Sequence, residues 1–358
     1  MIRVSIRSLL LIVFLGGQAA SAQDDAWQAR TALGWRAFQE GRYAEAEQLL
    51  SEAIAEAKNT EGAQHRLALA TSYLADLYRK QGRYRESESL FAQALALAPF
   101  QREDGLLRAG LLHKLGQLLA DQGKYAQAEA LYRHSLKETE KAVGQQHKLV
   151  AAMLSNLGQF YNTQRKFGRA RDALERAAAI WQTLRLPEDP EFATVLSNLG
   201  AAYYAQRKYA PAEAIFRRAL ALDEAGRGSE HVDVARDLNN LATVYLDTRR
   251  FAEAESLYQR SLALSEQAAG SELLYAQTLH NFAELRRKEE RFEEAKVLYQ
   301  RAAAVWESAL GPESPEFLQK LERLATAYRA MALYIEARNL QDRAAEIRVR
   351  HGFRARPK

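Results

Sequence analysis

Apolar residues recur along this chain with the spacing of amphipathic helices. Within each stretch of about 42 residues they follow helical spacing twice, and a short turn containing Gly, Arg or Lys separates the two parts. Each stretch is therefore expected to fold as two antiparallel helices. The 358 residues contain only 7 Pro and 19 Gly, while Ala, Leu, Glu, Gln and Arg dominate, so the composition also favours helices.

The two-helix pattern occurs eight times. Each copy carries an aromatic residue just after its turn, and successive copies lie 41 or 42 residues apart. These aromatic residues, called anchors below, are Tyr43, Tyr84, Tyr125, Phe167, Tyr209, Phe251, Phe292 and Tyr334. Because the copies fill nearly all of residues 23–350, the pattern leaves no room for a separate catalytic domain.

Several positions of the repeat always hold small residues. Three and ten residues after the anchor the residue is always Ala or Ser. Nine residues before the anchor it is always Gly or Ala: Gly34, Ala75, Gly116, Gly158, Gly200, Ala242, Ala283 and Ala325. Such a position predicts the close approach of two helix backbones. Pro99 predicts that the second helix of repeat 2 ends early.

The repeat resembles a known family. Leu199-Gly200, the anchor Tyr209 and the second-helix aromatic Phe216 illustrate columns that resemble the tetratricopeptide repeat. The long period and linkers such as GSEHVDVA (228–235) resemble the variety typified by kinesin light chains. The resemblance implies an all-α, right-handed α-solenoid of about eight helix-turn-helix repeats, with one atypical repeat at each end.

Composition and charge exclude several functions. The chain has no cysteine, so disulfides, thiol nucleophiles and cysteine-ligated metals are excluded. The net charge of +5 is concentrated at the ends: residues 1–22 carry +2 and residues 348–358 carry +5, which leaves −2 for the body. A nucleic-acid-binding surface should be basic, so no nucleic-acid partner is expected.

The first 22 residues are predicted to be a signal peptide. Arg3 and Arg7 precede the apolar run Leu9–Leu15, and Ala20-Ser21-Ala22 forms a small-residue cleavage site. Cleavage after Ala22 would give a periplasmic or secreted protein, and an uncleaved anchor is the alternative. For the basic tail, residues 351–358, two interpretations stay open: a weak contact with an anionic surface, and a frayed, solvated terminus.

The chain carries no recognisable catalytic motif. Phosphate-binding loops, H-E-x-x-H and G-x-S-x-G are absent, so we expect no enzyme, no cofactor and no metal. Linker histidines at equivalent repeat positions are expected to bond near helix starts: His65, His147 and His231. Trp181 and Trp306 are expected to be packing residues. Trp35 and Phe38 are expected either to form an apolar contact patch or to pack under an N-terminal extension.

The candidate binding site is a column of asparagines eleven residues before the anchor, Asn156, Asn198, Asn240 and Asn281. The resemblance implies that this column lines a concave groove, where an amide can both donate to and accept from a peptide backbone. Neighbouring candidates are Asn239, Arg236, His280, Arg287 and Lys288. The alternative is that these asparagines bond to adjacent repeats and only order the stack.

Together these features predict a non-enzymatic scaffold or adaptor that binds a partner protein, or an extended peptide of one, in the concave groove. The alternative is a periplasmic assembly factor or holdase chaperone with many clients. The sequence leaves the partner's identity and the oligomeric state undefined.

Overall fold

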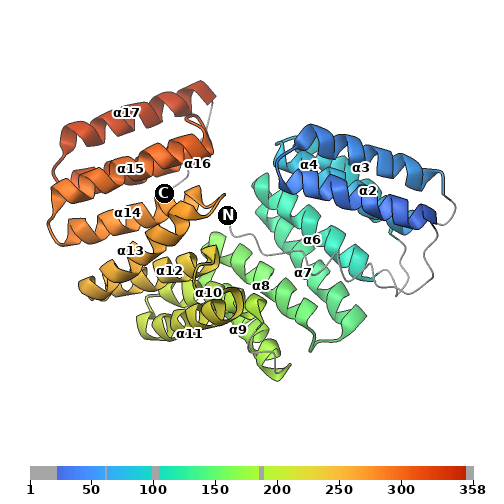
Figure 1. The fold of residues 1–358 in the computed structure, drawn as a ribbon, viewed down its shortest axis with the longest axis horizontal. Helices are drawn as coiled ribbons and strands as arrows, with labels where there is room; N and C mark the ends of the chain where they lie inside the picture. The colour runs from blue at the N-terminus through green and yellow to red at the C-terminus, as the bar shows by residue number, and fades with distance from the viewer. Residues whose placement is uncertain (1–21, 61–62, 99–104, 185–188, 352–358) are drawn as a thin grey trace. The chain divides into compact units, whose positions relative to one another are not determined.

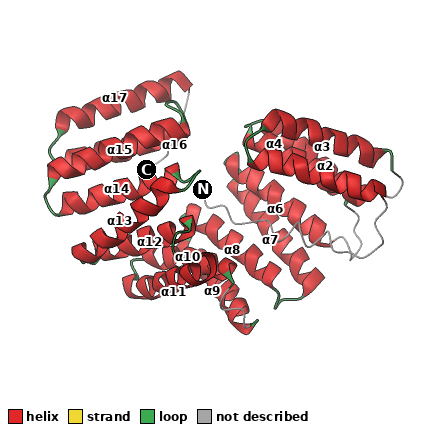
Figure 2. Ribbon diagram, viewed as in Figure 1, coloured by secondary structure: helices red, strands yellow, loops and turns green. Residues whose placement is uncertain are grey.

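The computed structural model describes residues 22–60, 63–98, 105–184 and 189–351. These residues form sixteen α-helices, and none of them lies in a strand (Figure 2). The predicted all-α fold is therefore confirmed. No helix in these ranges is long and apolar enough to cross a membrane. The predicted signal peptide lies outside the described residues except for Ala22, and so does the basic tail except for His351.

The chain divides into two compact units, residues 1–186 and 187–358, called unit 1 and unit 2 here (Figure 1). Each unit holds four of the eight repeats. The helices of unit 1 are α2 (Ala22–Gln39), α3 (Tyr43–Lys58), α4 (Gln64–Lys80), α5 (Tyr84–Leu97), α6 (Gly105–Asp121), α7 (Tyr125–Val143), α8 (Lys148–Thr163) and α9 (Phe167–Thr183). The helices of unit 2 are α10 (Pro190–Ala205), α11 (Tyr209–Arg227), α12 (Val232–Asp247), α13 (Phe251–Gln267), α14 (Glu272–Lys288), α15 (Phe292–Leu310), α16 (Pro315–Ala330) and α17 (Tyr334–His351).

Each anchor is the first residue of the second helix of its repeat, from Tyr43 in α3 to Tyr334 in α17. The predicted register of all eight repeats is thereby confirmed. The second helix of repeat 2, α5, has 14 residues and ends just before Pro99, whereas α7 has 19 residues. The early end predicted from Pro99 is also confirmed.

The small columns mark close contacts between helices, as predicted. The residues three and ten positions after the anchors are all buried, with at most 2% of their surface exposed. At Gly200 on α10, a side-chain Cβ would lie only 2.6 Å from Cε1 of Phe216 on α11. The two helices of repeat 5 therefore approach so closely that a methyl group would displace the facing ring.

The turn between the two helices keeps one backbone shape in all repeats. Two residues before the anchor, φ is positive at a glycine in repeats 1 to 3, such as Gly82 with φ 76°. In the later repeats a residue with a side chain takes the same conformation: Arg165, Arg207, Arg249, Glu290 and Ala332. Since such a residue carries a steric cost, packing of the two helices must impose this shape.

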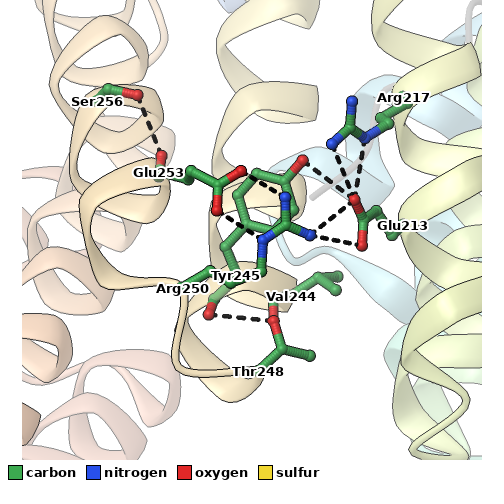
Figure 3. A network of polar contacts seen from close by, with 8 residues as sticks. All are labelled: Glu213, Arg217, Val244, Tyr245, Thr248, Arg250, Glu253 and Ser256. Atoms are coloured by element: carbon green, nitrogen blue, oxygen red, sulfur yellow. Dashed lines mark hydrogen bonds and ion pairs between the residues drawn. The ribbon is translucent and has the colours of Figure 1, made fainter.

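Ion pairs connect one repeat to the next (Figure 3). The guanidinium of Arg250, just before α13, donates to both carboxylate oxygens of Glu213 on α11, each at 2.9 Å. The same Glu213 accepts a hydrogen bond of 3.3 Å from the hydroxyl of Tyr245 on α12. Arg83 with Glu47 repeats this arrangement in unit 1. Carboxylates that the sequence places on outer helix faces thus also hold neighbouring repeats together.

Candidate functional site

The first helices of consecutive repeats form one surface in each unit. Within unit 2, α10 contacts α12 and α12 contacts α14, and within unit 1 α2 contacts α4 and α4 contacts α6. Within each unit, every second helix that is followed by another repeat packs between the first helices of its own and that next repeat. First helices are therefore the elements that approach their equivalents, which places them on the inner side of the stack. All nine candidate site residues lie on first helices.

The four column asparagines differ in exposure. Asn156 on α8 and Asn198 on α10 are buried, with 9% and 3% of their surface exposed. Asn240 on α12 and Asn281 on α14 are partly exposed. Because buried amides cannot reach a partner without rearrangement, the accessible part of the column lies in repeats 6 and 7.

The amide of Asn281 is occupied by neighbouring side chains. Its Nδ2 donates to Oδ1 of Asn239 at 3.0 Å, and its Oδ1 accepts a hydrogen bond of 2.9 Å from Nε2 of Gln277. Gln277 in turn accepts a hydrogen bond of 3.1 Å from Nζ of Lys320 on α16. A polar chain thus links the first helices of repeats 6, 7 and 8. For Asn281, this arrangement agrees with the alternative that the asparagines bond to adjacent repeats and order the stack.

The other asparagines divide between the two interpretations. Nδ2 of Asn156 lies 3.3 Å from Nε2 of His113 in the preceding repeat, and Asn198 is not free either. The side chain of Asn240, in contrast, forms no hydrogen bond with any residue of the described ranges. Asn240 is therefore the column member with an accessible amide available to a partner.

The cationic candidates each have an acidic neighbour. Arg236 pairs with Asp233 on the same helix, and NH2 of Arg287 donates to Glu284 at 2.7 Å. Nζ of Lys288 lies 2.9 Å from Oδ1 of Asp247 in the preceding repeat. The charges of these three residues are therefore largely compensated within the chain.

His280 is a neutral side chain in an aromatic surrounding. Its ring centroid lies 5.3 Å from that of Tyr299 and 5.5 Å from that of Trp306. Burial lowers the pKa of His280 to about 4, although Glu284 acts in the opposite direction. Its Nδ1 is buried and has no hydrogen-bond partner among the described residues. This nitrogen can donate or accept one hydrogen bond, depending on the tautomer, and the ring carries no charge at neutral pH.

The inner surface of unit 1 contains a buried ion pair. Nζ of Lys114 lies 2.5 Å from Oδ2 of Asp76, and both residues are at most 4% exposed. The ammonium also lies 4.9 Å from the ring centroid of Tyr73. Trp35 packs on Tyr73 with 4.8 Å between ring centroids, and Phe38 packs against the same core. Trp35 and Phe38 therefore contribute to packing in unit 1, although both remain partly exposed.

His147, His231, Trp181 and Trp306 behave as predicted, whereas His65 lies within α4, whose start has no side-chain cap. Nδ1 of His147 accepts from the backbone N–H of Leu149, and His231 caps α12 in the same way. Trp181 and Trp306 are at most 1% exposed, which confirms that they are packing residues. Within the described ranges, no three His, Asp or Glu side chains are arranged to hold a metal ion.

A buried acidic cluster in unit 2 was not predicted. Asp237 on α12 is 1% exposed and accepts a hydrogen bond from Oγ of Ser197, while its Oδ2 has no partner among the described residues. Asp223 on α11 is 3% exposed and lies 2.6 Å from Arg227. Burial raises the pKa of Asp223 to about 6 and that of Asp237 well above its usual value.

The sequence contained a signal for this cluster. The position fourteen residues before the anchor holds Leu111, Met153 and Val195 in repeats 3 to 5, but Asp237 in repeat 6. A charged residue in a column that is apolar in all the preceding repeats indicates a buried charge. The same column holds Lys320 in repeat 8.

A sequence model of the tetratricopeptide repeat matches residues 36–99, 107–183, 191–267 and 274–348. The chain belongs to the tetratricopeptide repeat family. Each match spans two of the eight repeats, so the family assignment and the helix register agree. The fold of tetratricopeptide repeat proteins is typical of protein–protein interaction scaffolds, and such proteins are generally not enzymes.

Solved structures with a similar fold include BtubC (BKLC) from P. vanneervenii, with a TM-score of 0.54 and 26% identity over 70% of this chain and 94% of that one. The quorum sensor NprR from B. thuringiensis has a TM-score of 0.63 and 15% identity, covering 92% of this chain and 89% of its own. A Rap protein complexed with Competence and Sporulation Factor has a TM-score of 0.61 and 13% identity, covering 96% and 91%. The last two similarities concern the fold alone. The matches also include a putative kinesin light chain from Podosopora anserina, with a TM-score of 0.48 and 21% identity over 58% of this chain and 99% of that one. No curated protein matches the chain in sequence.

Proposed function

We propose that this tetratricopeptide repeat protein is an exported, non-enzymatic scaffold that holds an extended segment of a partner protein on the first helices of unit 2. The contact between α12 and α14 supports this, because it makes one continuous surface from the first helices of repeats 6 and 7. An extended segment offers unpaired backbone N–H and C=O groups along its length. Side-chain amides on such a surface satisfy both kinds of group, whatever the sequence of the segment.

The proposal rests on the exposure and the unused hydrogen-bonding groups of the Asn240 side chain. Its side chain is partly exposed, and no residue of the described ranges uses its hydrogen-bonding groups. Asn281, one repeat further, has both its amide nitrogen and its carbonyl oxygen occupied by the chain itself. Because the Asn240 amide forms no hydrogen bond within the described ranges, it is available to bond a partner's backbone.

Site-specific photo-crosslinking in the native envelope tests the proposal. A photoreactive residue at position 240 should capture a partner that mass spectrometry identifies. The control is the same residue at position 256 on α13, where Ser256 is exposed on a second helix. One stoichiometric protein captured from position 240 and not from 256 supports the scaffold. Equal capture from both positions, or none from 240, contradicts the site.

The same experiment separates the scaffold from a holdase chaperone. A holdase would give many unrelated proteins from position 240, without a fixed stoichiometry. Export is tested independently of the groove, because it depends on residues 1–22 and not on the first-helix surface.

A further inference from the structure

The cations on the first helices of repeats 6 to 8 differ in whether an acid neutralises them. Arg236, Arg287 and Lys288 each pair with a carboxylate of the chain. Arg323 on α16 stands eleven residues before its anchor, the position that Asn281 holds in repeat 7. It is exposed, and its side chain forms no ion pair or hydrogen bond within the described ranges. Its guanidinium keeps all its donors available.

Lys320 lies one turn before Arg323 and adds a second poorly compensated charge. Its Nζ lies 4.5 Å from the ring centroid of Trp306, and its hydrogen bond to Gln277 goes to a neutral amide. Burial and then repulsion from Arg323 lower the pKa of Lys320, while Glu316 acts in the opposite direction. The ammonium would therefore gain from a further negative charge close by.

The surroundings of His280 have an excess of positive charge. Lys320, Arg323 and Arg287 all act on this ring, and Glu284 is the carboxylate that opposes them. Glu284 already accepts hydrogen bonds from Arg287 and from the Tyr299 hydroxyl. Because Glu284 already accepts these hydrogen bonds, it is not available to pair with Lys320 or Arg323 on α16.

The cations of α16 belong to the same surface as the proposed binding site. The hydrogen bonds from Lys320 to Gln277 and from Gln277 to Asn281 continue to Asn239, which precedes Asn240 on α12. This chain crosses three consecutive first helices without a break. A segment bound at Asn240 can therefore continue along the same surface to repeat 8.

We propose that Arg323 and Lys320 bind a side-chain carboxylate in an acidic stretch of the partner, which extends the binding surface to repeat 8. The inference rests on the proposed function. A guanidinium matches a carboxylate with two parallel hydrogen bonds, and the ammonium of Lys320 adds a point charge beside it. Acidic side chains of an extended segment are therefore what this end of the surface selects.

Fluorescence anisotropy with a short labelled peptide of alternating Gly and Glu, amidated at its C-terminus, tests the assignment. The wild-type protein should bind this peptide more tightly than its Gln counterpart, and added salt should weaken the binding. Arg323→Glu should weaken it about tenfold or more, because a hydrogen bond to a charged group is lost and a like charge is introduced. Arg323→Lys should retain part of the affinity.

Arg207→Glu is the matched control. Arg207 is also exposed, and its side chain forms no ion pair within the described ranges, but it lies in the turn between α10 and α11. Glu290 takes the same turn position in repeat 7 with φ 63°, so glutamate fits there. The control makes the same charge change away from the first-helix surface and should leave the affinity unchanged. Melting curves verify that both variants are folded.

Several outcomes would overturn the assignment. These are no preference of the wild-type protein for Glu over Gln, an unchanged affinity in Arg323→Glu, or equal losses in both charge variants. Binding that requires a free C-terminus on the peptide would assign the site to a chain terminus instead. A partner captured from position 240 whose affinity does not depend on Arg323 would leave the proposed function standing and remove only this inference.

Discussion

Replacing Gly200 with leucine should destabilise unit 2 by forcing apart the two helices of repeat 5. A Cβ at this position would lie 2.6, 2.8 and 2.9 Å from three carbons of the Phe216 ring, whereas ordinary contacts begin at 3.4 Å. The ring must retreat by about 0.8 Å to accept the first carbon, the difference between 2.6 and 3.4 Å. Leucine adds three further carbons. Overpacking of this kind costs about 1 to 3 kcal/mol in the free energy of unfolding.

Thermal unfolding followed by circular dichroism measures this cost. In a unit of this size the variant should melt roughly 2 to 12 °C below the wild type. Gly110→Leu is the matched control, because Gly110 also lies inside a first helix, α6, and a Cβ there would meet nothing within 4 Å. Leucine favours helices over glycine, so the control should melt at or above the wild-type temperature. Equal melting temperatures for the two variants would refute the packing argument.

Two further predictions concern the acidic cluster and export. The folded pKa of Asp223, about 6, and that of Asp237 lie above those of an unfolded chain, so the cluster's contribution to stability is complete near pH 4 and declines as the pH rises through these values. Asp237→Asn should therefore melt like the wild type near pH 4 and become relatively more stable at higher pH. Melting curves across this pH range measure the effect. A difference in melting temperature that does not change with pH would contradict the buried charge. N-terminal sequencing of the mature protein should begin at Gln23, and intact Met1 in the envelope fraction would disprove cleavage after Ala22.

The architecture was predictable because the repeat encodes it locally. A small residue facing a large one sixteen positions later, as with Gly158 and Leu174, reports a contact within one helix pair. The anchors likewise mark the start of each second helix, because this signal also lies within one repeat. Eight copies of such a local signal determine the register of the whole chain.

The roles of the site residues were less predictable because they depend on contacts between repeats. Asn240 and Asn281 occupy equivalent positions, yet only Asn281 has Asn239 and Gln277 as partners within the described ranges. The pairing of Lys288 with Asp247 joins residues 41 positions apart, and helical spacing within one repeat does not show it. Likewise, the sequence alone does not show that Arg323 lacks an acidic partner among the described residues, because this depends on where the surrounding acids lie in the structure.

The central claim is that a partner binds the surface on which Asn240 lies. The most direct test measures melting temperature and partner affinity for Asn240→Ala and Asn281→Ala, using the partner identified by crosslinking. Asn281→Ala should lower the melting temperature, because it leaves Gln277 and Asn239 without a bond worth about 1 to 3 kcal/mol. Asn240→Ala should melt like the wild type and bind the partner about tenfold more weakly, mainly through faster dissociation. An Asn240→Ala protein that melts early and binds with unchanged affinity per folded molecule would contradict the account.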